Sequence, residues 1–355
     1  MFYRLLVFFL VPFLALSGFS FPKDHSFHPE YKLEWCYFVG ILQTKEGKRL
    51  GYELSFFRTH ISAGSDLYPV HFAISDLQAK QHKIAQFSDR EIGGMAGYTA
   101  NAFWSGDYRV NILENGFQII AKPRQEQIAL ELQLSYPSEK DILLHGTNGY
   151  SQKSRKDPSI YSYYYSIPRL QTKGRLSING KKYTVQSGIT WMDHEWTSKG
   201  QKTVHLRSSK SAWDWLCLNL QDGTDLMVFN FRRSPKAEAE TFATLRYPDG
   251  RVKTFKKEKQ VFLMPSKEYW QSSKSGIRYP LQWQIRIPTE ELDLAVGAFF
   301  PEQEFDGRET TFLVYWEGAI QAKGKWKNKT VQGTGYLELK GYQENRSRNF
   351  LDYFR

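Results

Sequence analysis

The stretch Trp35-Cys-Tyr-Phe-Val-Gly-Ile-Leu-Gln43 begins a pattern that occurs twice in the chain. A turn at Lys45-Glu46-Gly47 follows it, and then an apolar run that ends at Arg58. Trp213 starts a similar segment, because it also stands seven residues ahead of a leucine and is followed by a turn with glycine and an apolar run that ends at Arg232. A strand, a turn and a second strand form a β-hairpin. Its recurrence half a chain apart predicts two similar units in tandem.

Strand patterns fill the rest of the chain. Apolar and aromatic runs alternate with turn signals such as Gln221-Asp222-Gly223 and Pro248-Asp249-Gly250. A weak helical pattern occurs only at residues 234–240. Aromatic residues make up 16% of the chain, which favours strands and large apolar pockets. The expected strands include residues 35–43, 49–57, 117–121, 128–134, 213–220, 225–231, 242–247, 251–255, 281–287, 292–299, 312–321 and 333–342. The predicted fold class is all-β, in barrels or sandwiches.

The N-terminal residues are typical of a secretory signal peptide. Arg4 precedes an apolar run at residues 5–16, which small residues follow. The run is shorter than the roughly 20 residues needed to span a bilayer, so cleavage near Ser17 or Ser20 is predicted, with an uncleaved anchor as the alternative. We expect an exported protein, periplasmic or extracellular, without an integral membrane domain.

The length of 355 residues predicts about two domains after the signal peptide. The expected division is a signal peptide at 1–20, an N-terminal domain at 21–203, a C-terminal domain at 204–345 and a tail at 346–355.

The formal net charge of +11 raises the question of a nucleic-acid partner. The lysines are scattered singly or in short runs beside turn residues, which is typical of a solvated β surface, so no nucleic-acid partner is expected. Cys36 and Cys217 could form one disulfide in an oxidising compartment. Each lies inside an aromatic run, so two separate buried thiols are the alternative.

The segment Trp191-Met-Asp-His-Glu-Trp196 is the densest group of chemically versatile side chains in the sequence. Side chains of a strand alternate between its two faces. One face therefore carries Trp191, Asp193 and Glu195, and the other carries Met192, His194 and Trp196. Buried groups of this kind must pair with one another or face a cavity.

A structural interpretation of this segment stays open beside the functional one. Asp193 and Glu195 could pair with an arginine, and thereby lock the two domains together at their junction; the candidates are Arg58, Arg169 and Arg207. Glu34, next to Trp35, is open to the same interpretation as an ion pair with an arginine, and Arg58 and Arg169 are the candidates.

Several segments carry a family resemblance: His25, His28-Pro-Glu-Tyr-Lys-Leu-Glu-Trp-Cys-Tyr37, Phe56-Phe57-Arg58, Tyr163-Tyr-Tyr-Ser-Ile-Pro-Arg-Leu170, Trp191 to Trp196, Trp213-Asp-Trp215 and Tyr315-Trp-Glu-Gly318. In this order, over nearly the whole mature chain, they resemble the AttH-type secreted lipocalin-like proteins, which are related to bacterial carotenoid 1,2-hydratase, also called hydroxyneurosporene synthase. The resemblance implies two tandem lipocalin-like β-barrel domains, of which the first is of the hydratase type. The chain departs from the family pattern at Cys36, where a second tryptophan is usual.

The resemblance also implies a chemistry. Carotenoid hydratases have a His-Asp-His-Asn-Trp type sequence at this segment, so Asp193, His194 and Trp196 match, whereas Met192 and Glu195 depart. Adding water to an isolated C=C bond starts with a proton delivered to carbon by a shielded acid and passes through a carbocation that an aromatic face stabilises. The catalytic candidates are Asp193, His194 and Glu195, and the candidates for ligand contact are Trp191, Trp196, Tyr163, Tyr164, Tyr165, Trp35 and Trp213. The loss of the first histidine favours binding over the hydratase reaction itself.

We therefore expect an exported protein that binds an apolar, isoprenoid- or lipid-like ligand, as an envelope carrier or an accessory of an envelope transport system. The alternative is a hydratase-like enzyme. No Gly-x-Ser-x-Gly elbow or phosphate loop is present, so a hydrolase is not indicated. The histidines lack tight ligand spacing, so no metal and no other cofactor is expected. A cavity that contains Asp193 or His194 would favour the enzyme, and acids paired between the domains would exclude it.

Overall fold

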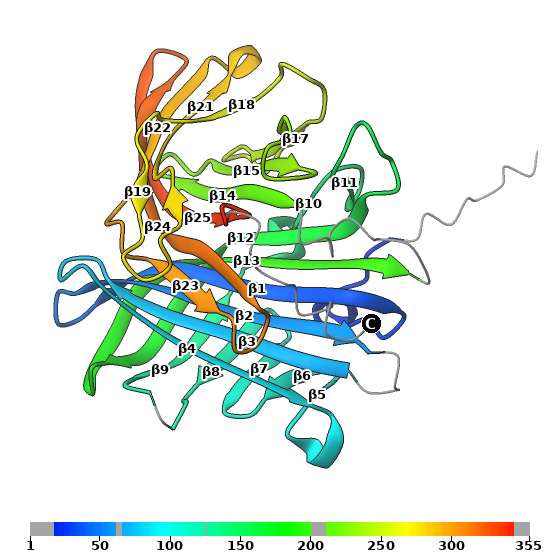
Figure 1. Cartoon of the computed structure of the whole chain (residues 1–355), viewed down its shortest axis with the longest axis vertical. Helices are drawn as coiled ribbons and strands as arrows, with labels where there is room; N and C mark the ends of the chain where they lie inside the picture. The colour runs from blue at the N-terminus through cyan, green and yellow to red at the C-terminus, as the bar shows by residue number, and fades with distance from the viewer. Residues whose placement is uncertain (1–17, 62–65, 125, 200–210, 344–355) are drawn as a thin grey trace, which may run out of the picture.

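The computed structural model describes residues 18–61, 66–124, 126–199 and 211–343, and these are almost entirely strands (Figure 1). The first sheet contains β1 (Tyr31–Thr44), β2 (Arg49–His60), β3 (Asp66–Asp76), β4 (Gln81–Arg90), β5 (Ala96–Thr99), β6 (Ala102–Ser105), β7 (Tyr108–Leu113), β8 (Gly116–Ala121), β9 (Ile128–Ser135), β10 (Leu143–Leu144), β11 (Tyr150–Gln152), β12 (Tyr161–Ile178) and β13 (Lys181–Lys199). The second contains β14 (Ala212–Leu220), β15 (Asp225–Arg232), β16 (Glu240–Arg246), β17 (Val252–Phe255), β18 (Phe262–Pro265), β21 (Gln282–Ile287), β22 (Leu292–Ala298), β23 (Glu304–Gly307), β24 (Leu313–Trp326) and β25 (Lys329–Lys340). The predicted all-β class is confirmed.

The remaining elements are short. A separate hairpin is formed by β19 (Trp270–Gln271) and β20 (Arg278–Tyr279), and the 3-10 helices are η1 (Lys23–His25), η2 (Ile92–Gly94), η3 (Glu139–Asp141) and η4 (Pro288–Glu290). The weak helical pattern at residues 234–240 does not produce a helix. This segment joins the antiparallel strands β15 and β16 through a turn, in which Ala237 N–H donates to the carbonyl of Ser234.

The two large sheets have a similar strand order. The first runs in the order β4-β3-β2-β1-β13-β12-β9-β8-β7-β6-β5, and its end strands β4 and β5 approach each other, so it nearly closes into a barrel. The second runs β17-β16-β15-β14-β25-β24-β22-β21-β18. In each sheet the last strand returns to pair with the first, β13 with β1 and β25 with β14. The two copies of the sequence repeat, β1–β2 and β14–β15, therefore occupy equivalent places. The predicted boundaries at 203/204 and 345/346 lie outside the described residues.

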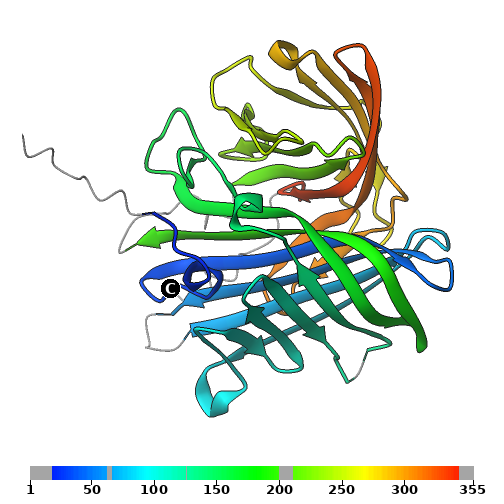
Figure 2. The ribbon, with the colours of Figure 1, turned by 180° about the vertical axis from the view of Figure 1, so that it is seen from behind.

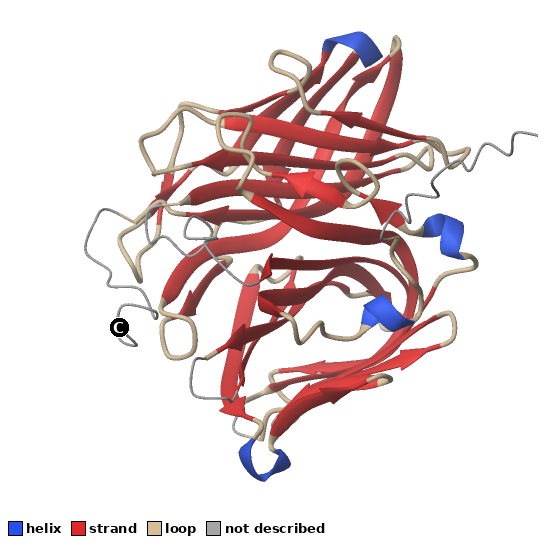
Figure 3. Cartoon of the chain, turned by 90° about the vertical axis from the view of Figure 1, so that its right-hand side faces the viewer, coloured by secondary structure: helices blue, strands red, loops and turns tan. Residues whose placement is uncertain are grey.

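The interior of the first barrel is filled with apolar side chains. Phe38, Leu54, Phe72, Phe117 and Leu132 come from five different strands and are all fully buried in one cluster. Figure 3 shows the strands of this sheet curving into a ring, with the second sheet arching beside it. Many of the aromatic residues noted in the sequence therefore pack in the barrel core.

The two sheets pack against each other through the strands that pair at the centre of each sheet, β1 and β13 of the first and β14 and β25 of the second, which lie together in the middle of the molecule (Figures 1 and 2). A second apolar cluster fills this contact and includes Tyr37, Trp191, Trp215 and Tyr336. Cys217 lies in this cluster, whereas Cys36 belongs to the barrel core. Both cysteines are free and buried, so the disulfide alternative is wrong and the buried-thiol alternative holds.

Among the described residues, none of the helices has the length and apolar character needed to cross a membrane.

Candidate functional site

The segment 191–196 lies on β13, and its two faces point to two different environments. Pairing with β1 is regular from Lys199 to Gly188, with no bulge that could mix the faces. Met192, His194 and Trp196 therefore point into the barrel, where all three are buried. The opposite face, with Trp191, Asp193 and Glu195, points toward the second sheet.

A cavity of about 230 Å³ lies between the two sheets, on the Asp193 side of β13. Aromatic side chains from both sheets form much of its wall: Trp35, Phe57, Tyr164, Trp213, Trp215, Phe229 and Tyr315. Ionisable side chains are set into this wall: Lys153, Asp193, Glu195, Glu317, Glu338 and Lys340. An apolar enclosure with a few convergent polar groups is the usual form of a small-molecule site.

Asp193 is the most unusual of these groups. Its Oδ1 accepts hydrogen bonds from Trp191 Nε1 (2.6 Å) and from Ser166 Oγ, and its Oδ2 accepts one from the Tyr164 hydroxyl. Burial raises the pKa of Asp193 to about 7, although the three hydrogen bonds act to lower it. Asp193 forms no ion pair with any cation in the described ranges. It can therefore hold or release a proton near neutral pH.

The ion pairs expected between Asp193 or Glu195 and an arginine are wrong for Arg58 and Arg169. Arg58 binds Asp66 at 2.6 Å, and Arg169 binds Asp225 at 2.8 Å across the contact between the sheets. Both guanidinium groups have closer carboxylates on neighbouring loops and strands. The third candidate, Arg207, lies outside the described residues.

Hydrogen bonds extend from Asp193 to both sheets. Ser166 Oγ also contacts His145 Nε2 at 2.6 Å, and His145 Nδ1 contacts Thr244 Oγ1 of β16 at 3.0 Å. On the other side, Trp215 Nε1 of β14 donates to the Tyr164 hydroxyl at 3.0 Å. Burial lowers the pKa of His145 well below its usual value, so the imidazole is neutral. The second sheet thus helps to position the acid carried by the first.

Glu195, two residues further along the same face, has a different partner. Its carboxylate pairs with Lys153 Nζ at 2.7 Å, and this ammonium also lies 4.5 Å from the centre of the Tyr164 ring. Both charged groups are buried. Glu195 therefore balances a buried cation, and Asp193 remains the free acid of the pair.

Three more carboxyl groups belong to this region: Glu317 and Glu338 line the cavity, and Glu53 contacts the cavity residue Tyr315. Tyr37 donates to Glu317, Trp213 Nε1 donates to Glu338 (2.9 Å) and the Tyr315 hydroxyl donates to Glu53 (3.1 Å). Burial raises the pKa of Glu53 to about 7 and that of Glu338 to about 8, and it raises the pKa of Glu317 well above its usual value. These acids hold protons that solvent-exposed glutamates would release.

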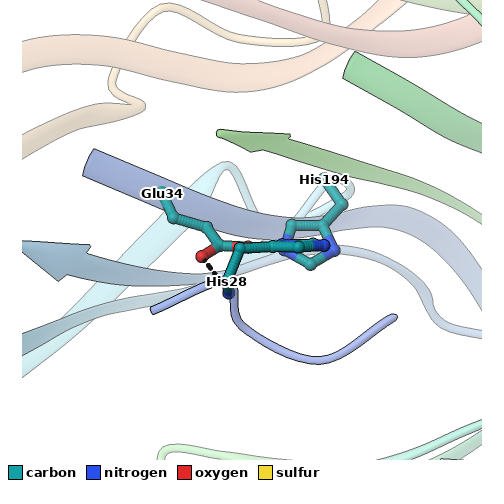
Figure 4. A group of neighbouring side chains, drawn as sticks. All are labelled: His28, Glu34 and His194. Atoms are coloured by element: carbon teal, nitrogen blue, oxygen red, sulfur yellow. Dashed lines mark hydrogen bonds and ion pairs between the residues drawn. The ribbon is translucent and has the colours of Figure 1, made fainter. Parts of the chain in front are cut away.

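A separate polar group lies on the barrel side of β13, where His194 meets Glu34 of β1 and His28 of the segment before β1 (Figure 4). Glu34 Oε1 lies 2.7 Å from both His28 Nδ1 and His194 Nε2, and Glu34 Oε2 accepts from the backbone N–H of His28 and lies 3.8 Å from Arg58. Burial acts to raise the pKa of Glu34, but the two histidines lower it to about 2. Burial acts to lower the pKa of His28, but Asp24 and Glu34 raise it to about 9. Glu34 thus lies at ion-pair distance from Arg58, one of the two arginines considered for it.

These three residues are also the ones that could hold a metal ion, since their ligand atoms lie within 4.8 Å of one another. In the structure, however, Glu34 Oε1 already forms hydrogen bonds with His28 Nδ1 and His194 Nε2. The hydrogen bonds explain the burial of each group without an ion. These hydrogen bonds hold the N-terminal segment that contains His28 at the barrel mouth. There the His28 ring stacks on the Trp196 ring, with 3.9 Å between the ring centres.

The residues predicted for one site are thus divided between two places. The cavity is lined by five of them: Asp193, Glu195, Tyr164, Trp35 and Trp213. Trp191 donates a hydrogen bond to Asp193. His194 and Trp196, together with Tyr163 and Tyr165, cluster at the barrel mouth, on the opposite side of the strand from Asp193. The alternation of strand side chains is the physical reason.

Several residues of the site were missed from the sequence: Lys153, Glu317, Glu338 and Lys340, which line the cavity, and Ser166 and His145, which connect to Asp193 through hydrogen bonds. A signal was present in the run Tyr336-Leu-Glu-Leu-Lys340, where polar and aromatic residues alternate with leucines. The leucines of this strand enter the second core, and its other face meets the cavity, where Lys340 is buried and Glu338 is partly buried. Buried charges at alternate positions are a sign of a site.

The comparisons with known proteins agree with this architecture. The AttH-like family model matches residues 14–342. The chain belongs to the AttH-like family. No curated protein sequence matches it.

Solved structures resemble this AttH-like protein over most of its length. A structure assigned to AttH from Nitrosomonas europaea is 29% identical, with a TM-score of 0.81, over 94% of this chain and 100% of that chain. Kievitone hydratase from Nectria haematococca is 15% identical, with a TM-score of 0.70, over 92% of this chain and 94% of that chain. The protein CghA is 12% identical, with a TM-score of 0.53, over 89% and 90%. At such low identity the last two show a shared fold only.

Proposed function

We propose that this AttH-like protein binds an apolar, isoprenoid- or lipid-like molecule in the cavity between its sheets, and that Asp193 protonates a C=C bond of the bound ligand so that water adds to it. The observation that supports this most strongly is a buried carboxyl group, unpaired with a cation in the described chain, in the wall of an aromatic cavity. A general acid works best when its pKa lies near the working pH. Kievitone hydratase, whose fold this chain shares, is by its name a hydratase.

The steps follow from the groups present. The Asp193 proton passes to the less substituted alkene carbon, the π electrons form the new C–H bond, and a tertiary carbocation remains on the other carbon. The indole faces of Trp35, Trp213 and Trp215 line the cavity in which this cation would form, and an aromatic face stabilises a desolvated cation by about 2 kcal/mol. A water oxygen then bonds to the cation and returns one proton to Asp193.

The hydrogen bonds of Asp193 suit this sequence of events. Tyr164, Ser166 and Trp191 all donate to its oxygens, so they stabilise the carboxylate that forms when the proton leaves. Because the ring of Trp191 and the hydroxyl of Ser166 are buried in the sheet, the donors are already in place before the reaction. The cavity is also small, so it suits a short isoprenoid or the end of a longer chain that extends outward.

The test uses citronellol, a short isoprenoid alcohol with a trisubstituted C=C bond. The purified protein is incubated with citronellol in water enriched in heavy oxygen, and the diol is sought by mass spectrometry. We expect labelled diol from the wild-type protein and a loss of about a hundredfold with Asp193→Asn. Asp107→Asn, an exposed aspartate on the far barrel hairpin, is the matched control and should leave the rate unchanged.

Binding without turnover would instead support a carrier. In that case organic extracts of the protein purified from its own envelope would contain a bound apolar molecule, equally in wild-type protein and in Asp193→Asn. If citronellol neither reacts nor binds, and the extracts are empty, the proposal of an apolar ligand site is wrong.

Export to the cell envelope is also part of the proposal, and it is supported by the signal-like sequence of residues 1–20. Phe19, near the predicted cleavage region, packs 5.2 Å from the ring of Trp196 at the barrel mouth. A mature chain that begins at Gly18 keeps this contact, so cleavage after Ser17 suits the fold better than cleavage after Ser20. Sequencing the N-terminus of the protein from the envelope fraction tests this.

A further inference from the structure

Lys340 lies at the end of β25 with its ammonium group in the cavity wall. Its side chain is only 7% exposed. Nζ donates to the backbone carbonyl of Ser211 at 2.5 Å and lies 4.6 Å from the centre of the Trp213 ring. A buried ammonium normally requires a carboxylate partner. Within the described parts of the chain, Lys340 has none at ion-pair distance.

The other lysine of the cavity shows the contrast. Lys153 pairs with Glu195 at 2.7 Å, so its charge is balanced and its nitrogen is engaged. Lys340 has only a carbonyl oxygen and an indole face, and burial lowers its pKa to about 8, although nearby Glu338 acts to raise it. A lysine in such surroundings is a free amine for part of the time at neutral pH, and a free amine is a nucleophile.

We propose that Lys340 forms an imine with an apolar aldehyde or ketone that enters the cavity, and so holds a carbonyl ligand covalently. This rests on the proposed function in one respect only, that the cavity admits apolar molecules. The aromatic wall around Nζ suits the hydrocarbon part of such a ligand, and the position of Nζ at the wall allows its approach to the carbonyl carbon.

The reaction balances with groups that are present. The Nζ lone pair bonds to the carbonyl carbon, the C=O π electrons move to oxygen, and this oxygen takes up a proton while the nitrogen loses one. The C–O bond of the carbinolamine then breaks, water leaves, and the nitrogen lone pair completes the C=N bond. No oxidant or reductant is needed.

Glu338 is positioned to move these protons. It stands two residues before Lys340 on the same face of β25, lines the same cavity, and is held by Trp213 Nε1 at 2.9 Å. Burial raises its pKa to about 8, so the protonated acid is present to protonate the departing hydroxyl group and the carboxylate can take up the proton lost by nitrogen.

The test uses citronellal, an isoprenoid aldehyde with a saturated carbonyl end, and sodium cyanoborohydride, which reduces an imine to a stable amine. Peptide mass spectrometry then locates added mass equal to the aldehyde less one oxygen atom. We expect roughly tenfold more label on Lys340 than on the exposed Lys173 or on the ion-paired Lys153 of the same molecules.

Lys340→Arg keeps the positive charge but cannot form the imine, so it should lose the label at residue 340. Lys173→Arg is the surface control and should leave the label on Lys340 unchanged. Binding of citronellol, the matching alcohol, is followed in each variant through tryptophan fluorescence.

The outcomes separate this inference from the proposed function. If citronellol binds but Lys340 takes up no more label than Lys173, the imine is wrong and the apolar site stands. If citronellol fails to bind while Lys340 is labelled selectively, the imine is supported and the hydration proposal loses its basis. Equal labelling of wild-type protein and Lys340→Arg would overturn the imine regardless of binding.

Discussion

The two faces of β13 each carry three side chains of the segment 191–196, and yet their electrostatic surroundings are opposite. On the barrel face, His194 belongs to a network in which every charge of Glu34 and His28 has a close partner. On the cavity face, Asp193 is held by neutral donors and has no cation beside it in the described structure. Balanced charges stabilise a fold, whereas an unbalanced buried acid is costly to the fold and useful for chemistry.

The largest effect should come from breaking the balanced face. Glu34→Ala leaves His28, His194 and Arg58 without their shared carboxylate, and we expect the free energy of unfolding to fall by about 3 to 5 kcal/mol. Urea denaturation followed by far-ultraviolet circular dichroism measures this loss. A change below about 1 kcal/mol would mean that the network contributes little and that the two faces do not differ in this way.

The corresponding change on the cavity face should affect chemistry more than stability. Asp193→Asn keeps the size of the side chain and removes the proton donor, so hydration of citronellol should fall by about a hundredfold. The same denaturation experiment should show a stability loss smaller than that of Glu34→Ala. The reverse order, with unaltered turnover and a large stability loss, would make Asp193 a structural residue.

The pH dependence of stability sharpens the comparison. Glu338 has a pKa raised by burial to about 8, so between pH 4.5 and 8 the folded protein keeps a proton that the unfolded chain releases. Stability contributed by this proton is therefore present at low pH and is lost as the pH rises through this window. Glu338→Gln should flatten this decline by on the order of 2 kcal/mol, as measured by urea denaturation at pH 5 and pH 8.

Glu34 should behave in the opposite way. Its pKa is lowered to about 2, so its contribution is present above its ordinary value of 4.5 and is lost only as the pH falls toward 2. Glu338→Gln should leave this acid limb unchanged. A wild-type stability that rises steadily from pH 5 to pH 8 would contradict the assignment of protonated acids to the cavity.

The smallest expected effect tests how the second sheet supports the acid. Trp215→Phe keeps the aromatic wall but removes the hydrogen bond to Tyr164, which should cost about 1 kcal/mol of stability. The rate of citronellol hydration should fall only a few-fold, because Ser166 and Trp191 still bind Asp193. Trp104→Phe, at a surface hairpin of the barrel where Nε1 donates to the Gly94 carbonyl, is the matched control for the loss of an indole hydrogen bond and should leave the rate unchanged.

The fold was predictable in its class and in much of its detail. The hairpins that begin at Trp35 and Trp213 occupy equivalent places in the two sheets. They were predictable because turn residues and alternating apolar residues determine a hairpin locally. The weak helical pattern at residues 234–240 became a turn, because the pairing of the flanking strands overrode it. The site was predictable only in part: Asp193 and Glu195 were found, while Lys153, Glu317 and Lys340 were not.

The sequence by itself determined that Trp191, Asp193 and Glu195 share one face of a strand and that Met192, His194 and Trp196 share the other, because alternation is a property of the extended backbone. Only the tertiary structure decided which face enters the packed barrel and which meets a cavity. That choice depends on β14, β24 and β25, whose side chains lie far away in the chain and reach Asp193 only when the two sheets pack together. A strand fixes the direction of its side chains locally, but the surroundings that set a pKa or leave an amine unpaired are assembled from distant segments.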